Sequence, residues 1–587
     1  MVLVLMCGML VACKPDEGPD EPSKGGGGGD DIRPTDSWYD SIFWDEDSFI
    51  FKLTENSNKQ ELPSTCARYL AGDTDRGLLP GEVADDIDDM VDVRNSDAEF
   101  VTKVTPRYVY ISDDTSHGWG RNVNDMVYDM SNFVPNQTPD AYCNFVYDML
   151  IASLNGAFAN LKSSSIATDG VKANYFRFTS PTFVDTGKGY MVEYMRSLSL
   201  SRNKQYCLSS DYFTDMVRAF FVVPVNVTLL QTIAPSTEHG KFNYDYDGDG
   251  LYELEDFYEY VYEYKWTYNT LAEISAAGFY DNTDAMDVYG NPNGDLNDRL
   301  IFAITDASGL SASGMLYTTS VTIIKRDKAD LVDGEGVEYT DYVYEYPTDN
   351  PDLYEFCNNL TSLMSENKGV ISITKDQCGD YSTDALLAIR NRFTNDRILF
   401  GGAICLGSLE YLDYREMENG FGVVPVPLFR EKKGDAQEIY MTQIHNIGRI
   451  GAINAKTLKF AKISAYLDYQ SVNSTEILNE YYNYKLSYDV AGGGDNVAML
   501  NFIRSNVRTS FDKAFEDAIG RLFATDSSGN VNDGEGTSSE QQKWHALIMA
   551  EHFQLDGAGM AEAYAKYIES KGERLDILEK SYVGLPS

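Results

Sequence analysis

Hydrophobic and polar positions along this chain follow two periods, and the period changes several times. Residues 85–100 (DDIDDMVDVRNSDAEF) carry apolar side chains near helical spacing, whereas residues 101–111 alternate β-branched and aromatic side chains as a strand does. The runs at 220–225 (FFVVPV) and 421–427 (FGVVPVP) are short and continuously apolar, which is typical of strands buried on both faces. A further strand is predicted at 450–454, and further helices at 457–469, 496–519, 540–553 and 560–570. This alternation of strands and helices predicts an α/β architecture with mostly parallel sheets.

The start of the chain is an uncharged apolar run, residues 1–12, that leads into Cys13. A bilayer span needs about 20 apolar residues, so this run fits the h-region of a secretory signal better than a membrane helix. The small residues before Cys13 resemble a bacterial lipobox, after which the leader is cleaved and the cysteine thiol receives a diacylglycerol. No Lys or Arg precedes Cys13, so we expect the leader to be truncated at its amino end. We predict a protein anchored by acyl chains to the extracellular face of the bacterial cell membrane.

Residues 14–35 support this interpretation. They contain four prolines, five consecutive glycines and several acidic residues, with almost no apolar side chain. Such a segment cannot bury enough surface to offset the entropy of ordering it, so it predicts a flexible linker. The linker would hold a globular body clear of the lipid headgroups.

The net charge of −43, from 91 acidic and 48 basic residues, excludes one class of partner. Proteins that bind nucleic acid cluster Lys and Arg against the phosphate backbone, and this chain has the opposite balance. The same balance disfavours a peripheral grip on anionic lipid. A strongly acidic composition otherwise indicates a well-solvated exterior.

Segments spread over residues 36–520 carry a resemblance to a known family. They include 205–226 (QYCLSSDYFTDMVRAFFVVPVN), 397–412 (RILFGGAICLGSLEYL), 418–429 (ENGFGVVPVPLF) and 450–469 (IGAINAKTLKFAKISAYLDY). In this order, and behind a lipobox and linker, they resemble the family 1 extracellular solute-binding lipoproteins of ABC importers, the branch that includes sugar binders. The chain looks like one of the long members found in Gram-positive anaerobes. Its extra length is largest before residue 85, between 327 and 352, and after 520.

The resemblance implies a two-lobe periplasmic-binding-protein-like fold, in which crossover segments join two α/β lobes and the ligand is held between them. It implies a hinge at Val223, Pro224, Val225 and Asn226. The expected domains are a leader at 1–12, the anchor cysteine and linker at 13–35, the first part of lobe 1 at 36–224, the first part of lobe 2 at 225–400, a return to lobe 1 at 401–450, and the rest of lobe 2 with C-terminal helices at 451–587.

The sharpest local motif, at 245–256, matches the calcium-loop pattern D-x-[DN]-x-[DN]-G with an acidic residue at the twelfth place. Alternate carboxylates would point inward, a glycine would make the sharp turn, and a carbonyl would supply the seventh ligand. The predicted Ca²⁺ ligands, in a structural site, are Asp245, Asp247, Asp249, the Leu251 carbonyl, Glu253 and Asp256. The alternative is a solvated acidic turn in a very acidic protein.

Sugar binding needs flat aromatic faces beside planar polar groups. Trp119 lies between glycines in a predicted loop, and we name it as a candidate ligand contact. Trp266, in a segment that resembles the start of a family helix, is a second candidate, with packing in the core as its alternative.

Cysteine and histidine add no site to this list. Cys66, Cys143, Cys207, Cys357, Cys378 and Cys405 are scattered, so both disulfides and buried free thiols stay open. The sequence contains no GxSxG elbow, no P-loop and no HExxH motif. We therefore predict a non-enzymatic, lipid-anchored receptor that delivers a solute, with carbohydrate or oligosaccharide as the expected class, to an ABC permease. The alternatives are a surface glycoside hydrolase, or other polysaccharide-acting lipoprotein, and a structural or adhesive surface lipoprotein.

Overall fold

The structure is a computed structural model of the 587-residue chain. It describes residues 31–32, 45–55, 66–78, 83–111, 121–166, 172–179, 189–199, 201–233, 244–251, 253–281, 298–305, 315–316, 318–322, 324–332, 336–373, 385–418, 420–445, 448–486 and 493–509. Cys13, Trp119 and the linker apart from Asp31 and Ile32 lie outside these residues, as do the predicted helices at 540–553 and 560–570. Within the part of the chain that is described, no helix has both the length and the apolar character that a membrane crossing requires.

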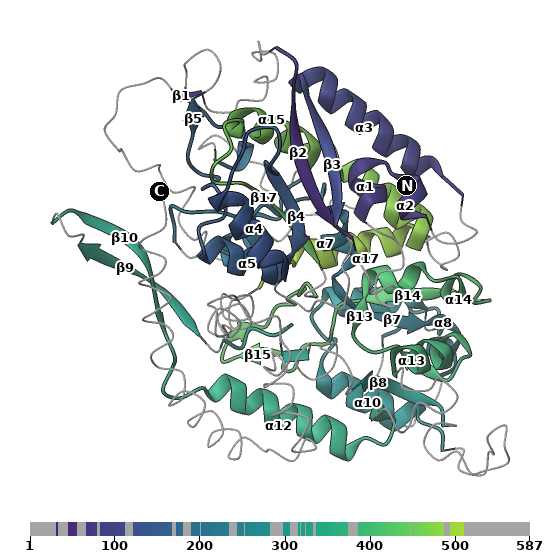
Figure 1. Ribbon diagram of the computed structural model, residues 1–587. Helices are drawn as coiled ribbons and strands as arrows, with labels where there is room; N and C mark the ends of the chain where they lie inside the picture. Colours follow the sequence, from purple (N-terminus) through teal and green to yellow (C-terminus); the bar gives the residue numbers. More distant parts are fainter. Residues whose placement is uncertain are drawn as a thin grey trace, which may run out of the picture.

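Two sheets divide the molecule into an upper and a lower lobe in Figure 1. The sheet of lobe 1 has the strand order β17-β4-β2-β3. Its strands are β2 (Asp47–Thr54), β3 (Val104–Ile111), β4 (Ala141–Phe145) and β17 (Arg449–Ile453). β2 is parallel to β3 and to β4, whereas β17 is antiparallel to β4. All residues of β4 and β17 are buried, so both faces of this part of the sheet are covered.

The longest helix of lobe 1, α3 (Asp86–Thr102), shows why its segment folds as predicted. Its N-cap is Asp85, whose carboxylate accepts the Ile87 N–H, while the Asp88 carboxylate accepts the Asp85 N–H in return. The helix ends at Lys103, which has a left-handed backbone conformation. Its buried face packs against α15 (Phe460–Val472), on the lobe 1 sheet.

The other elements of lobe 1 are mostly short. The helices are α1 (Cys66–Ala71), α2 (Thr74–Gly77), α4 (Arg121–Ser131), α5 (Val146–Leu154), α6 (Val192–Ser197), α7 (Thr214–Arg218) and α16 (Thr475–Glu480), with helical turns η3 (Arg177–Thr179) and η9 (Tyr481–Leu486). A small separate sheet is formed by β1 (Asp31–Ile32), β6 (Lys172–Ala173) and β5 (Ser165–Ile166).

The sheet of lobe 2 has the strand order β11-β8-β12-β7-β13, and β14 also pairs with β7. Its strands are β7 (Phe221–Asn226), β8 (Leu300–Thr305), β11 (Val370–Ile373), β12 (Ile398–Phe400), β13 (Ile404–Cys405) and β14 (Phe421–Val424). β8 is parallel to β11 and β12, and β7 is antiparallel to its neighbours. Every residue of β7 is buried, as its continuous apolar sequence predicts.

Helices cover the lobe 2 sheet. They are α8 (Val227–Ile233), α9 (Leu254–Tyr262), α10 (Tyr268–Gly278), α12 (Pro351–Glu366), α13 (Ala385–Thr394), α14 (Leu412–Arg415), α17 (Gly493–Ser505) and the turn η8 (Leu406–Glu410). A two-residue hairpin pair, β15 (Lys432–Lys433) and β16 (Ala436–Gln437), lies after β14.

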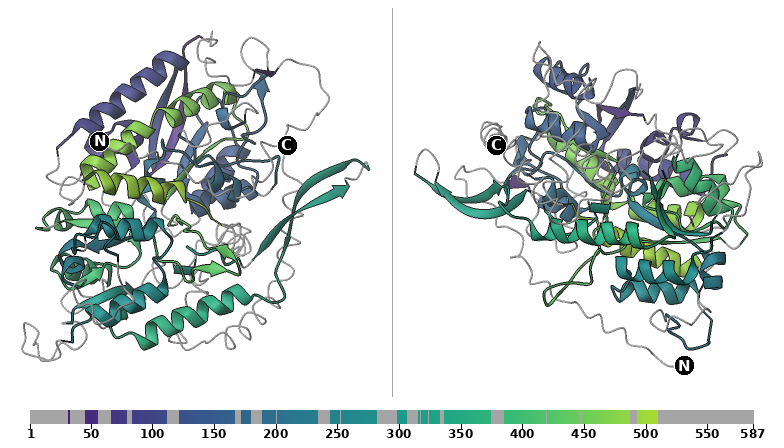
Figure 2. Two further views of the ribbon diagram at one scale, coloured as in Figure 1. Left: turned by 180° about the vertical axis from the view of Figure 1, so that it is seen from behind. Right: turned by 90° about the horizontal axis from the view of Figure 1, so that it is seen from below.

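A long ribbon, β9 (Lys325–Val332) paired with β10 (Glu338–Glu345), projects from the body in all three views (Figures 1 and 2). It lies in the segment whose extra length the sequence indicated. The two ends of this insertion meet, because the Asn350 side-chain amide donates to the Thr322 carbonyl at 2.8 Å.

The α/β, two-lobe architecture with crossovers is confirmed by this strand pairing, but two of the expected boundaries are wrong. Residues 401–450 were assigned to lobe 1, yet β13 and β14 pair with β7 in lobe 2. Residues 451–587 were assigned to lobe 2, yet β17 pairs with β4, and α15 packs on α3, in lobe 1. A continuous apolar pattern predicts that a strand is buried, but it does not indicate which of two sheets the strand joins.

Candidate functional site

Two passes of the chain between the lobes lie side by side. The first, at 219–221, leads from α7 in lobe 1 into β7 in lobe 2, and the second, at 442–445, leads back toward β17. The Phe221 N–H donates to the Gln443 carbonyl (3.0 Å), and the His445 N–H donates to the Ala219 carbonyl (2.8 Å). Because these hydrogen bonds tie the passes together, both must deform in any rotation of one lobe against the other.

A third segment extends this unit. Residues 506–508 follow α17 and lie beside Thr442, whose N–H donates to the Asn506 carbonyl (2.9 Å) and whose carbonyl accepts the Arg508 N–H (3.3 Å). The Thr442 hydroxyl also donates to the Ile503 carbonyl at 2.7 Å. We call segments 219–221, 442–445 and 506–508 the crossover unit.

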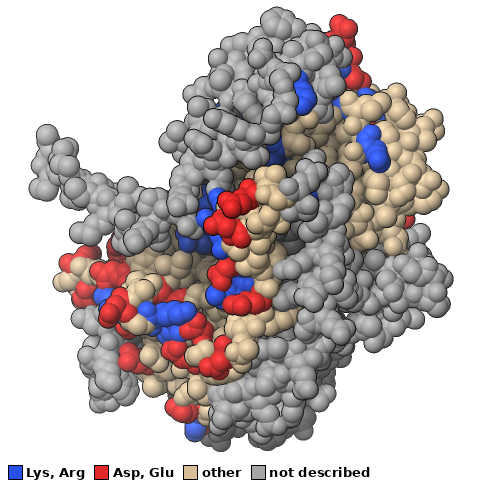
Figure 3. Space-filling model, turned by 90° about the vertical axis from the view of Figure 1, so that its left-hand side faces the viewer, with Lys and Arg blue, Asp and Glu red and all other residues tan. Residues whose placement is uncertain are grey.

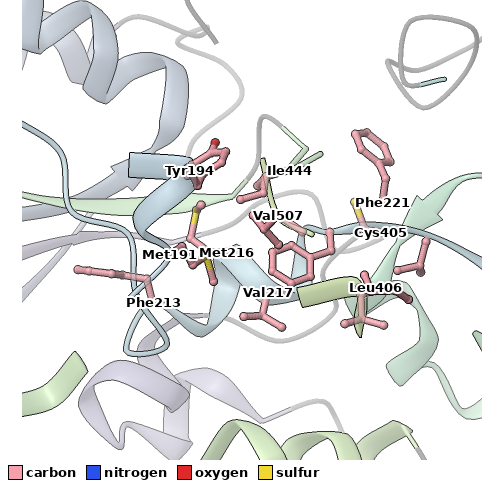
Figure 4. Close-up of a cluster of buried hydrophobic side chains, with 14 of the residues drawn as sticks. Met191, Tyr194, Phe213, Met216, Val217, Phe221, Cys405, Leu406, Ile444 and Val507 are labelled. Carbon is pink, nitrogen blue, oxygen red and sulfur yellow. The ribbon is translucent and has the colours of Figure 1, made fainter. Parts of the chain in front are cut away.

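Apolar side chains from both lobes fill the space around the crossover unit (Figure 4). Val217 and Met216 come from α7, Cys405 and Leu406 come from lobe 2, and Val507 comes from the third segment. All are buried. Since close packing leaves few alternative arrangements of such side chains, this cluster favours a small set of interlobe angles.

Buried charges lie next to this apolar cluster. Arg218 of α7 donates from Nε to Oε1 of Glu410 at 2.7 Å and from Nη1 to Asp215 at 2.5 Å. Asp215 also pairs with Arg449 of β17, and the Tyr481 hydroxyl donates to Glu410 at 2.6 Å. Burial disfavours the charged guanidinium, but the carboxylates of Glu410 and Asp215 outweigh it and hold the pKa of Arg218 above its usual value.

This network joins the lobes. Glu410 belongs to η8, which follows β13 of the lobe 2 sheet, whereas Arg218 and Asp215 belong to lobe 1. The side chains of Arg218 and Asp215 are fully inaccessible to solvent, and that of Glu410 is 5% exposed. A buried ion pair fixes geometry more than it adds stability, because desolvation offsets its attraction.

His445 marks the other side of the crossover unit. Its ring packs edge-on against Phe221, with centroids 5.5 Å apart. Burial lowers the pKa of His445 to about 3, so the imidazole is neutral at physiological pH.

The parallel strands of both sheets end on the side that faces the crossover unit. In lobe 1, Phe145 at the end of β4 is opposite Arg449, the first residue of β17. In lobe 2, β12 ends at Phe400 and the chain then pairs with Phe221 at the start of β7. Open α/β sheets bind ligands beyond the carboxyl ends of their strands, so this arrangement turns two such edges toward one interlobe space.

The predicted hinge and aromatic contacts need correction. Val223 to Asn226 pair with β14 within the lobe 2 sheet, so the crossover begins earlier, at 219–221. Trp266 is fully buried between Phe257 and Phe400, and its indole N–H donates to the Pro425 carbonyl at 2.9 Å. Trp266 therefore packs in the core, which was the alternative to a ligand contact. Trp119 lies outside the described residues.

The acidic loop at 245–251 brings three predicted metal ligands together. One carboxylate oxygen from each of Asp245, Asp247 and Asp249 lies within 4.8 Å of the others. The turn needs Gly248 and Gly250, which have φ of 78° and 84°. The carboxylates accept backbone N–H groups of the loop, including Gly248 N–H to Asp245 at 2.7 Å.

The last two predicted ligands behave differently. Asp256 accepts the Tyr246 N–H (2.9 Å) and the Glu253 N–H (3.3 Å), and the latter bond forms the capping box of α9. Glu253 is exposed, and partial desolvation, followed by the neighbouring Asp249 and Glu255 carboxylates, raises its pKa. The loop thus presents crowded carboxylate oxygens, which a hard divalent cation such as Ca²⁺ would neutralise.

Five of the six cysteines that follow Cys13 lie in the described residues. They are all buried free thiols: Cys66, Cys143, Cys207, Cys357 and Cys405. Burial raises the pKa of Cys66 to about 12 and that of Cys357 to about 12, as expected for unreactive core thiols.

The ion pair between Arg218 and Glu410 escaped prediction because 192 residues separate its partners. A signal existed for Arg449. It is a charged residue at the head of the apolar strand 450–454, where an unpaired guanidinium would be costly to bury.

No protein-family model matches the chain, and a search of curated proteins finds no match. Among solved structures, the chain is similar to a family 1 extracellular solute-binding protein from Bifidobacterium longum subsp. infantis. The identity is 10%, the match covers 90% of this chain and 100% of that one, and the TM-score is 0.44. It is similar to the extracellular solute-binding protein from Staphylococcus aureus in complex with maltose, with 10% identity, 89% of this chain and 98% of that one covered, and a TM-score of 0.43. It is also similar to the GacH receptor of Streptomyces glaucescens GLA.O, with 13% identity, 89% of this chain and 99% of that one covered, and a TM-score of 0.41. The two-lobe fold described above rests on the strand pairing of this chain itself.

Proposed function

We propose that this protein is a solute receptor that binds its ligand between the two lobes and delivers it to an ABC permease. One observation carries the proposal: the parallel strands of both sheets end toward the same interlobe space, and hydrogen-bonded crossovers join the lobes there. A ligand held between two such edges would contact both lobes and stabilise one interlobe angle. The sequence resemblance to sugar-binding importer proteins supports carbohydrate as the solute class.

The lipid anchor is part of this proposal. Cys13 and the Gly/Pro-rich linker would tether the receptor to the extracellular face of the membrane, beside the permease. A tether confines the loaded receptor near its partner and raises the effective concentration of the encounter.

We also propose that the loop at 245–256 holds a structural Ca²⁺ ion. Asp245, Asp247 and Asp249 supply carboxylates, and the Leu251 carbonyl and Glu253 follow in the calcium-loop order. Asp256 would contribute indirectly. Its oxygens accept backbone N–H groups of the loop, and these hydrogen bonds hold the loop against α9. When bound, the ion would offset the repulsion among the carboxylates.

Ligand-induced stabilisation tests the receptor proposal. Purified protein without its leader is heated in the presence of mono- and oligosaccharides, polyols, amino acids and peptides; maltose and D-mannitol, ligands named for similar solved structures, are included. A ligand that binds only the folded state raises the free energy of unfolding by RT ln(1 + [L]/Kd), about 2.7 kcal/mol at one hundred times Kd. We expect at least one carbohydrate to raise the melting temperature, without release of new reducing ends. An unmoved melting temperature across the panel contradicts the proposal, and release of reducing sugar favours the hydrolase alternative.

A further inference from the structure

The ribbon β9–β10 belongs to lobe 2 by its connections but contacts lobe 1. It leaves the chain after Thr322 and rejoins it at Asn350, just before α12 of lobe 2. Its partners lie between residues 196 and 202, at the carboxyl end of α6 and just after it. That stretch belongs to lobe 1, because the chain around it is bridged to β17 through Leu208 and Gly451. In Figure 1 the ribbon lies well away from the crossover unit around α7 and β13.

Arg326 makes the first contact between ribbon and lobe 1. Its Nη1 donates to the Ser199 carbonyl (2.8 Å) and to the Arg196 carbonyl (3.1 Å), at the carboxyl end of α6. The guanidinium carbon stands 4.3 Å from the ring centroid of Tyr342 on the paired strand, which holds the side chain in place. A cation on the last carbonyls of a helix is a favourable arrangement, and here the cation comes from the other lobe.

Asp341 makes the second contact. Its Oδ2 accepts the Ser201 hydroxyl (2.7 Å) and its Oδ1 accepts the Arg202 N–H (2.9 Å). The Asp341 carboxylate also acts on the pKa of two lysines of lobe 1. Burial lowers the pKa of Lys162 to about 8 and lowers that of Lys204, while Asp341 favours the charged form of both.

The two contacts come from opposite strands of the ribbon and hold the same short segment of lobe 1. Asp341 pairs with Ala329, and Arg326 pairs with Tyr344, so the contacts are three register positions apart. Val332, at the distal end of β9, is 64% exposed. The side of the molecule from which the ribbon projects carries basic side chains beside acidic ones (Figure 3).

We propose that the β9–β10 ribbon is an interlobe strap, in which Arg326 and Asp341 hold residues 196–202 of lobe 1 and limit how far the lobes separate about the crossover unit. Opening beyond the present angle requires these hydrogen bonds to break, so the strap sets the range of interlobe distances. The inference rests on contacts between the lobes and does not depend on the identity of the solute.

Pulsed dipolar spectroscopy tests the strap on the ligand-free protein without its leader. Spin labels are carried by noncanonical residues at Tyr128 of lobe 1 and Tyr280 of lobe 2, which are 67% and 59% exposed. We expect Arg326→Ala with Asp341→Ala to broaden the distance distribution toward longer distances. The matched control is Lys325→Ala with Asp327→Ala, which removes one positive and one negative charge from the same ribbon. Lys325 pairs with Asp327 and with Glu345, all within the ribbon. The control should keep the wild-type distribution.

Hydrogen exchange gives the local readout. The Arg202 N–H loses its acceptor in the double variant, and we expect its exchange to accelerate about tenfold while the control stays unchanged. An unchanged distance distribution in the double variant overturns the proposal, whether or not exchange accelerates.

A reversible cross-link removes any dependence on how the double variant folds. Ser201→Cys with Asp341→Cys places two thiols where a 2.7 Å hydrogen bond now joins the side chains. We expect the oxidised form to show a narrow distance distribution and the reduced form of the same protein a broader one. Identical distributions in the two redox states contradict a strap.

Discussion

Arg218 and Glu410 form a buried ion pair across the two lobes, with Nε and Oε1 2.7 Å apart, directly beside the crossover unit. Because one partner belongs to α7 and the other to η8, the pair fixes how lobe 2 sits on lobe 1 at the point where the chain passes between them.

Removing the guanidinium should be costly. We expect Arg218→Met to lower the free energy of unfolding by roughly 3–5 kcal/mol, because the Glu410 carboxylate loses its compensating charge while it stays buried. Chemical denaturation at neutral pH measures the change. The control is Arg196→Met, which breaks an ion pair with Glu193 in which both side chains are about half exposed, and should cost under about 1 kcal/mol. Equal costs for the two variants would show that the buried pair does not hold the lobes.

His445 should make stability depend on pH. Its pKa is about 3 in the folded protein and about 6.5 when unfolded, so the unfolded chain binds the extra proton first as the pH falls. The stabilisation is complete above pH 6.5 and is lost between pH 6.5 and 3, at a slope of about 1.4 kcal/mol per pH unit in the middle of that range. Comparing denaturation of the wild type and His445→Gln from pH 7 to pH 4 isolates this contribution. Parallel pH profiles would contradict a buried neutral imidazole.

Calcium should stabilise lobe 2 through the loop at 245–256. We expect a chelator to lower the melting temperature of the wild type, and Asp245→Ala with Asp249→Ala to abolish that sensitivity. Asp92→Ala with Asp97→Ala removes two exposed carboxylates from α3 of lobe 1 and should stay as sensitive as the wild type. Equal melting of the wild type with and without chelator would show that the acidic loop is a solvated turn.

Cys13 should carry the lipid. We expect cells that express the full-length protein to incorporate labelled fatty acid into it, and Cys13→Ala to abolish incorporation and release the protein from the membrane fraction. Cys405→Ala is the matched control, since that thiol is buried and should leave labelling unchanged. Label in the Cys13→Ala protein would place the anchor elsewhere.

Periodicity predicted local structure well. The helix expected at 85–100 is α3, and the strands expected at 220–225, 421–427 and 450–454 are β7, β14 and β17, each within a few residues. The buried residues of these segments recur at regular positions, and the spacing of apolar residues in the sequence reflects that regularity.

Pairing between distant segments was less predictable. The strands β13 and β14 join β7, and β17 joins β4, although all have the same apolar character. Asp256 shows a second limit of sequence patterns. Its position in the sequence fits both the twelfth residue of a calcium loop and the third residue of a helix. In the structure, Asp256 forms the capping box of α9.

The hydrogen bond between Asn350 and Thr322 closes the base of the β9–β10 insertion. The chain therefore enters and leaves the ribbon at nearly one point, and a short turn could join the two ends at little cost in loop-closure entropy. In evolutionary terms the ribbon is a removable module: it can be lost, lengthened or exchanged while the lobe 2 sheet and α12 keep their places. The same junction is a site at which a reporter domain could be inserted.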